Sequence, residues 1–88
     1  MHAIVIRSTL HDFEAGTKSL KEEVIPRLKA VPGFVGAQWV RLDENTGTAM
    51  LTFESVEAMQ AVMEMMKTNP PVGVTINTIE TGEVAARV

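Results

Sequence analysis

The sequence contains no cysteine and no tyrosine, and aromatic residues make up only 5% of its 88 positions. Without cysteine, the chain can form neither disulfides nor thiolate-based zinc and iron–sulfur sites. A formal net charge of −3 argues against nucleic-acid binding, which needs a basic surface. Apolar runs span only a few residues, so no membrane span and no secretory signal is predicted. We therefore expect a soluble, cytoplasmic protein that binds neither nucleic acid nor membranes.

The composition is that of one folded domain. Hydrophobic residues account for 45% of the chain and charged residues for 22%, which is the balance of ordinary globular proteins. Eighty-eight residues are too few for two separate cores. We therefore treat residues 1–88 as a single domain.

Local patterns predict four strands and two helices. The β-branched segments 2–9, 34–42, 48–54 and 72–80 are typical of strands, the last extended by a bulge past Gly82. Apolar residues at helical spacing predict one helix from Phe13 towards the Pro32-Gly33 stop and a second after Ser55 that ends before the prolines at 70 and 71. This βαββαβ order predicts an α+β, ferredoxin-like fold, in which both helices cover one face of a four-stranded antiparallel sheet.

Single residues mark the start of each predicted helix and a kink in the first one. Asp12 and Ser55 are suited to cap the two helices, because their side-chain oxygens can accept from free backbone N–H groups. Pro26 removes one donor inside the first helix and predicts a kink there.

Apolar side chains occur on both faces of the predicted strands, although two helices can cover only one face. We assign the more aliphatic set to the helix side: Ile4, Ile6, Phe34, Val40, Met50, Val74 and Ile76. The helix-free face then carries Val5, Arg7, Val35, Trp39, Arg41, Leu51, Phe53, Thr75, Asn77 and Ile79. Monomers rarely expose a patch built on tryptophan and phenylalanine, so a two-fold symmetric homodimer is predicted.

Two segments carry a family resemblance. EVIPRLKAVPGFVG (23–36) and LTFESVEAM (51–59) resemble the dimeric α/β-barrel superfamily, in particular its antibiotic-biosynthesis monooxygenase-like domains. The matching features are a proline-glycine-aromatic step into the second strand and an aromatic-acidic-serine step into the second helix. The resemblance implies two sheets that face each other across a two-fold axis and enclose a cavity between their helix-free faces. It also implies that Phe53 replaces a cavity-lining tryptophan and that Arg7 lies near a polar active-site position.

The superfamily includes cofactor-free monooxygenases, haem-degrading enzymes and small-molecule binders. Haem-degrading members carry a histidine on or after the second helix, whereas residues 65–71 contain none, so haem degradation is not expected. The lack of tyrosine removes a usual hydrogen-bonding partner for phenolic substrates and weakens the case for an oxygenase.

Four residues are candidates for binding a ligand: Arg7, Trp39, Phe53 and Asn77. An apolar concavity with a few directed polar groups is what small-molecule sites need. Arg7 could hold an anionic or enolate oxygen, and Asn77 could donate to a carbonyl group. These residues predict a homodimer that encloses a small, partly aromatic organic ligand, with cofactor-independent, monooxygenase-like chemistry as the enzymatic form of that function.

Two alternatives stay open. Arg7 can instead pair with a carboxylate across the dimer while Trp39 and Phe53 fill interface volume, which describes a non-catalytic dimer without a void. His11, Asp12 and Glu14 lie close in sequence, but their spacing is unspecific and Asp12 serves as a cap. The sequence therefore assigns no catalytic residue, no metal site and no cofactor.

Overall fold

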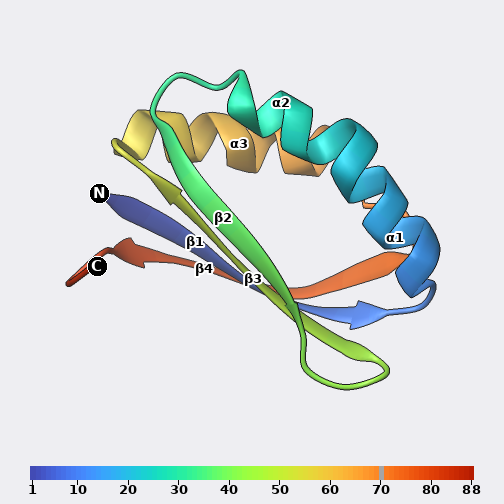
Figure 1. Cartoon of the computed structure of the whole chain (residues 1–88). Helices are drawn as coiled ribbons and strands as arrows, with labels where there is room; N and C mark the ends of the chain where they lie inside the picture. Colours follow the sequence, from blue (N-terminus) through green and yellow to red (C-terminus); the bar gives the residue numbers. More distant parts are fainter. Residues whose placement is uncertain (70) are drawn as a thin grey trace.

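The computed structural model describes residues 1–69 and 71–88, and it has the predicted ferredoxin-like architecture. The elements follow the order β1 (His2–Leu10), α1 (Phe13–Ser19), η1 (Leu20–Val24), α2 (Ile25–Lys29), β2 (Phe34–Arg41), β3 (Thr46–Phe53), α3 (Val56–Thr68) and β4 (Val74–Glu83). The four strands form one antiparallel sheet in the order β2-β3-β1-β4. The α1–η1–α2 segment and α3 cover the same face of that sheet (Figure 1). Pro70, one of the two prolines predicted to end the second helix, lies outside the described residues.

The first helical segment contains a π-helical turn where a proline kink was predicted. Asp12 caps it as expected, because its Oδ1 accepts from the backbone N–H of Ala15 at 3.0 Å. In η1 the N–H of Ile25 donates to the carbonyl of Leu20, five residues earlier. Pro26 then falls in the first turn of α2, where a missing N–H costs little. The chain thus passes the proline by widening one turn.

The step from α2 into β2 requires glycine at position 33. Gly33 has φ +86°, and a Cβ atom there would lie 3.1 Å from the Cβ of Ala58. Its carbonyl accepts from the backbone N–H of Glu54 at 2.7 Å. The predicted helix stop is therefore also a close contact between the loop before β2 and α3.

A β-bulge in β2 decides which side chains face the helices. Phe34 pairs with Phe53, but the next pair is Gly36 with Thr52, so Val35 is an extra residue and the alternation of faces reverses after it. Directly paired residues share a face of the sheet. Trp39 consequently packs against the core on the helix side.

The face assignment made from the sequence is therefore wrong for β2 and β3. Val40 and Met50, predicted to lie beneath the helices, are 44% and 43% exposed. Leu51 and Phe53, predicted on the helix-free face, are 2% and 0% exposed. In β3, Leu51 faces the helices because it pairs with buried Ile4 of β1. Both faces of β3 carry apolar residues, so the sequence did not indicate this register.

A second bulge lies in β4, where the register with β1 shifts between Arg7 and Ser8. The sequence predicted a bulge near Gly82 instead. The observed bulge is at Asn77, which has no partner in β1 because Arg7 pairs with Thr78 and Ser8 with Ile76. Ile79 pairs with Ile6 and so belongs to the helix side, which corrects its predicted place. Asn77 stays on the helix-free face, where its Nδ2 donates to Thr9 Oγ1 at 2.9 Å.

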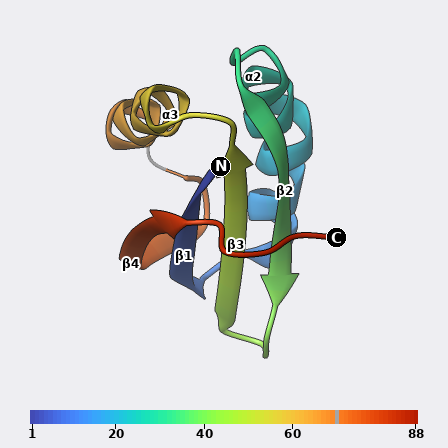
Figure 2. The same cartoon turned by 90° about the vertical axis from the view of Figure 1, so that its left-hand side faces the viewer.

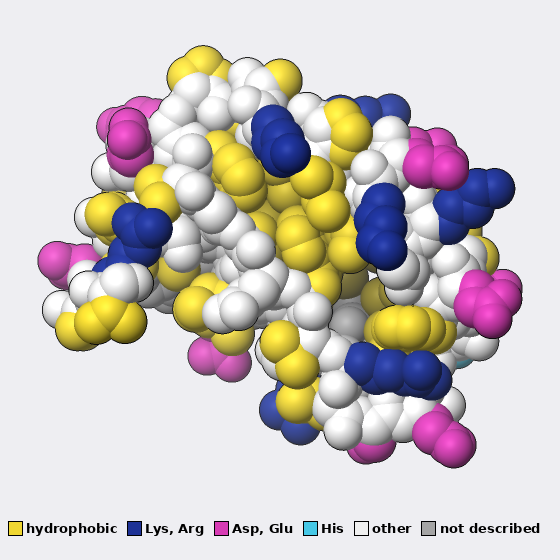
Figure 3. Space-filling view, in the orientation of Figure 1, with side chains coloured by type: hydrophobic (Ala, Val, Ile, Leu, Met, Phe, Trp, Pro, Cys, Tyr) yellow, Lys and Arg dark blue, Asp and Glu magenta, His cyan; other side chains and the backbone are white. Residues whose placement is uncertain are grey.

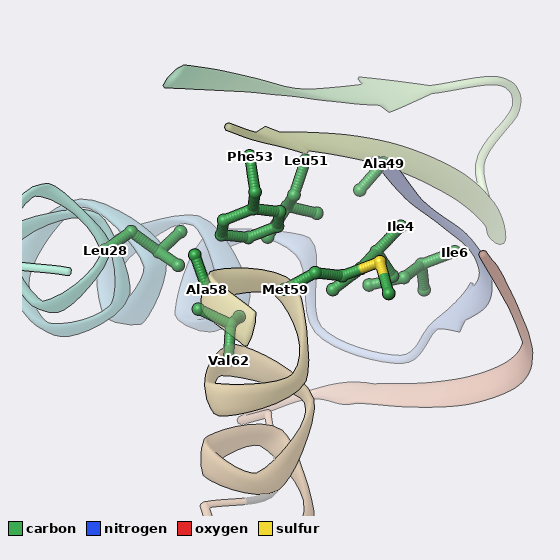
Figure 4. Packing of buried hydrophobic residues seen from close by; sticks show 9 residues of the cluster. All are labelled: Ile4, Ile6, Leu28, Ala49, Leu51, Phe53, Ala58, Met59 and Val62. Atoms are coloured by element: carbon green, nitrogen blue, oxygen red, sulfur yellow. The ribbon is translucent and has the colours of Figure 1, made fainter. Parts of the chain in front are cut away.

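The core lies between the sheet and the helices (Figure 4). Phe53 and Phe34 meet edge to face, with ring centroids 5.7 Å apart and an interplanar angle of 61°. Ser55 caps α3 by accepting from the N–H of Ala58 at 3.2 Å. The buried cluster comprises Ile4, Ile6, Leu28, Ala49, Leu51, Phe53, Ala58, Met59 and Val62.

Beyond β4 the chain passes in front of β1 and β3, on the side away from the helices (Figure 2). Val84 N–H donates to the carbonyl of Met1 at 2.9 Å, and Arg87 Nη1 approaches the sulfur of Met1 at 3.7 Å. Within residues 1–69 and 71–88, none of the helices is long and apolar enough to cross a membrane.

Candidate ligand-binding cavity

A cavity of about 360 Å³ lies between the α1–η1 segment and the sheet. Its volume is near the lower end of the range for small-molecule sites. Figure 3 shows hydrophobic side chains in a hollow beside β2, with Lys and Arg side chains around it. The apolar lining includes Ile6, Trp39 and Ala49 from the sheet and Leu20 and Val24 from η1.

The floor of this cavity depends on the bulge at Val35. By reversing the faces of β2, the bulge turns Trp39 towards the helices, directly opposite Ala49 of β3. Ala49 is buried, and its small side chain leaves space beside the half-buried indole. The pairing of one large and one small residue thus creates room that two large side chains would fill.

The roof of the cavity is the π-helical turn. Two pairs of adjacent residues contribute to the lining: Leu20 and Lys21, and one turn later Val24 and Ile25. Single π-helical turns within helices often occur at functional sites. Here the turn brings the start of η1 and the start of α2 to the same cavity.

The hydroxyl groups of the lining are mostly engaged within the protein. Ser8 Oγ donates to the carbonyl of Gly47 at 3.4 Å, and Thr48 Oγ1 donates to the carbonyl of Ile6 at 2.9 Å. Ser19 Oγ donates to Glu23 Oε2 at 3.4 Å. The lining therefore presents few hydroxyl donors to a ligand.

Two cations, Lys21 and Arg41, are the charged side chains of the lining, which contains no carboxylate and no imidazole among the residues that the structure covers. The Arg41 guanidinium lies 4.1 Å from the centroid of the Phe13 ring, a cation–π contact. Its Nη2 also donates to the carbonyl of Glu44 at 3.3 Å. The cavity thus combines apolar walls with two positive charges.

Of the four ligand-binding residues predicted from the sequence, Trp39 lines this cavity. Phe53 is at the centre of the core, fully buried. Arg7 and Asn77 are exposed on the helix-free face, so ligand binding by them stays a prediction about that face. The cavity described above lies on the helix side of the sheet, whereas the predicted cavity between two helix-free faces stays a prediction.

Sequence reasoning missed Lys21 and Arg41 as site residues. Arg41 was assigned to the helix-free face, but its pairing with Gly47 turns it towards the helices. Lys21 lies within the first predicted helix, and nothing in the sequence indicates a π-helical turn there. A glycine opposite an arginine near the end of a hairpin is the one signal that could have drawn attention to this position.

The remaining titratable groups lie outside the cavity lining. His11 Nε2 and Thr75 Oγ1 are 2.7 Å apart and share a hydrogen bond. In the turn between β2 and β3, the backbone N–H of Asn45 donates to Asp43 Oδ1 at 2.8 Å and lowers the pKa of that carboxyl group. A search of the described residues finds no cluster of three His, Asp or Glu side chains that could hold a metal ion.

Comparisons with known proteins define the fold class. No protein-family model matches the sequence, and no curated protein sequence matches it either. Solved structures do match, among them a dimeric ferredoxin-like protein from an uncultured marine organism, with a TM-score of 0.72 and 11% identity over 99% of this chain and 97% of that chain.

Two further matches have named activities. SnoaB from Streptomyces nogalater, a cofactor-independent oxygenase, has a TM-score of 0.63 and 18% identity over 99% of this chain and 93% of its own. The haem degrader MhuD from Mycobacterium tuberculosis has a TM-score of 0.58 and 21% identity over 98% of each chain. The chain thus has the fold of the antibiotic-biosynthesis monooxygenase-like and dimeric ferredoxin-like proteins. Identities this low establish the fold and leave the chemistry open.

Proposed function

We propose that the protein binds a small, largely apolar organic molecule in the cavity between the α1–η1 segment and the sheet. The observation that carries this proposal is the cavity of about 360 Å³ in so small a protein, lined mainly by apolar side chains. The cavity is partly open to solvent, so a ligand can reach it. An apolar concavity with few polar groups is the usual form of a small-molecule site.

A cavity-filling variant tests this proposal. Ala49→Leu adds a larger side chain to the floor at a buried position, at a cost of up to about 3 kcal/mol where neighbours must move, so circular dichroism melting first checks that the variant is folded. Ala61→Leu makes the same change at an exposed position of α3 and serves as the matched control. Titration calorimetry with the neutral ligand phenylbutyramide should detect one site per chain in the wild type and in Ala61→Leu, but none in Ala49→Leu. Equal binding by all three proteins would place the ligand elsewhere and refute the proposal.

A second candidate is cofactor-independent oxygenation, which the fold shared with SnoaB favours. Because the described lining holds no carboxylate or imidazole, the substrate must ionise by itself. An activated CH₂ group would lose a proton to water, and the carbanion would add O₂. The resulting hydroperoxide would then lose water to leave a carbonyl group. Oxygen uptake with anthrone should be faster with the wild type than with Ala49→Leu, and equal rates would remove this candidate.

We further propose that the helix-free face forms a homodimer. Trp39 and Phe53, on which the sequence argument relied, lie on the other face, but Val5 and its cross-strand partner Met50 remain exposed there, at 44% and 43%. Val40 adds a third exposed apolar side chain. Sedimentation equilibrium should give twice the chain mass of 9.6 kDa, and Met50→Lys should lower it to a single chain. A wild-type mass of one chain at micromolar concentration would exclude the dimer.

A further inference from the structure

We infer that the cavity selects organic anions, with a carboxylate held between Lys21 and Arg41 and the apolar part of the ligand against Trp39. This inference rests on the proposed function, because it names the class of molecule that the cavity binds. Both cations belong to the lining of the same cavity. Both residues are exposed, so their charges stay solvated and can exchange water for an anionic ligand.

Neither cation has a carboxylate partner among the described residues. Over residues 1–69 and 71–88 the one ion pair joins Lys67 to Glu64 on α3. Glu14 and Glu22 line a second, more open groove together with Lys21, and neither carboxylate lines the cavity. The positive charge on the cavity side is therefore left for a ligand to neutralise.

The charge of the cavity lining differs from that of the chain as a whole. The protein has a formal net charge of −3, with eleven acidic and eight basic residues. In this chain with more acids than bases, the described part of the lining holds two bases and no acid. The formal charge of the lining thus differs in sign from the net charge of the molecule.

Arg41 is held in place before a ligand arrives. Its guanidinium stacks on the Phe13 ring and gives one donor to the carbonyl of Glu44. A guanidinium has five N–H donors, so others remain for a ligand. A planar, fixed fork of donors suits a carboxylate, which it can bind in a bidentate manner at little entropic cost.

A matched pair of ligands separates this inference from the proposed function. Phenylbutyrate and phenylbutyramide have the same carbon skeleton, but only the first is an anion at neutral pH. In titration calorimetry with the wild type we expect the acid to bind about tenfold more tightly than the amide, the effect of one or two charge-assisted hydrogen bonds near the surface. Raising the salt concentration should weaken binding of the acid and leave the amide unaffected.

Charge-removal variants then locate the preference. The double variant Lys21→Gln/Arg41→Gln should bind acid and amide with equal affinity. Lys18→Gln removes a charge from the same helix, outside the cavity lining, and should keep the preference. Circular dichroism melting checks that each variant is folded. If the double variant does not fold, the salt dependence of acid binding to the wild type still tests the inference.

Each outcome has a separate meaning. Tighter binding of the acid that is lost in the double variant supports the inference. Equal affinity of the wild type for acid and amide overturns the inference and leaves the proposed function intact. A preference for the acid that persists in the double variant means that other residues bind the anion, and this also overturns the inference. Binding of neither compound overturns the proposed function, and the inference with it.

Discussion

Truncation of Phe53 to alanine removes the largest fully buried side chain of the core. Changes of this type cost about 3–5 kcal/mol, because the lost transfer free energy adds to that of the cavity left behind. Phe53 is 0% exposed and also loses its edge-to-face contact with Phe34. We therefore expect Phe53→Ala to lower the free energy of unfolding by about 4 kcal/mol. A domain of 88 residues has a stability of roughly 4–13 kcal/mol, so the variant will be marginally folded.

Urea unfolding followed by far-ultraviolet circular dichroism measures this loss. Phe53→Leu keeps most of the volume, should cost less than about 1.5 kcal/mol and should bind phenylbutyramide as the wild type does. Gln60→Ala, at an exposed position of α3, is the control and should change stability by no more than about 0.5 kcal/mol. A loss of less than about 1 kcal/mol for Phe53→Ala would refute the view that this ring is the centre of the core.

Three further substitutions test separate features of the fold. Val40→Asp should still unfold cooperatively in thermal melts, because the side chain of Val40 is 44% exposed. Loss of a cooperative transition would indicate that Val40 is part of the core. Gly33→Ala should cost at least about 1 kcal/mol in urea unfolding, because φ is +86° and Ala58 is in the way; an unchanged midpoint would contradict this geometry. Pro26→Ala should change stability by less than about 1 kcal/mol, since no N–H is needed there, and a large drop in melting temperature would assign the proline a structural role.

The elements and their order could be predicted because their signals are local. The β-branched runs, the capping side chains of Asp12 and Ser55 and the glycine at position 33 each act within a few residues. The caps and the glycine occur at the predicted positions, and the strands occur within three residues of the predicted bounds. The faces of β2 and β3 could not be predicted in the same way. They depend on one inserted residue, Val35, and on which residue of β1 each residue of β3 meets.

The candidate site was harder to predict for a related reason. Trp39 was identified as a ligand-binding candidate because of its residue type, but its direction follows from the bulge at Val35. Lys21 and Arg41 reach the cavity through a π-helical turn and a strand register, neither of which has a reliable sequence signal. Residue chemistry thus suggested a ligand, whereas the location of the cavity required the pairing of distant segments.

The fluorescence of Trp39 tests the central claim most directly, because it is the single tryptophan of the chain and it lines the cavity. Titration with phenylbutyrate should change the emission of the wild type saturably, with the same affinity as calorimetry gives, and should leave the emission of Ala49→Leu unchanged. An indole signal that stays constant in the wild type up to saturating ligand, or one that responds equally in Ala49→Leu, would contradict a ligand site beneath the π-helical turn.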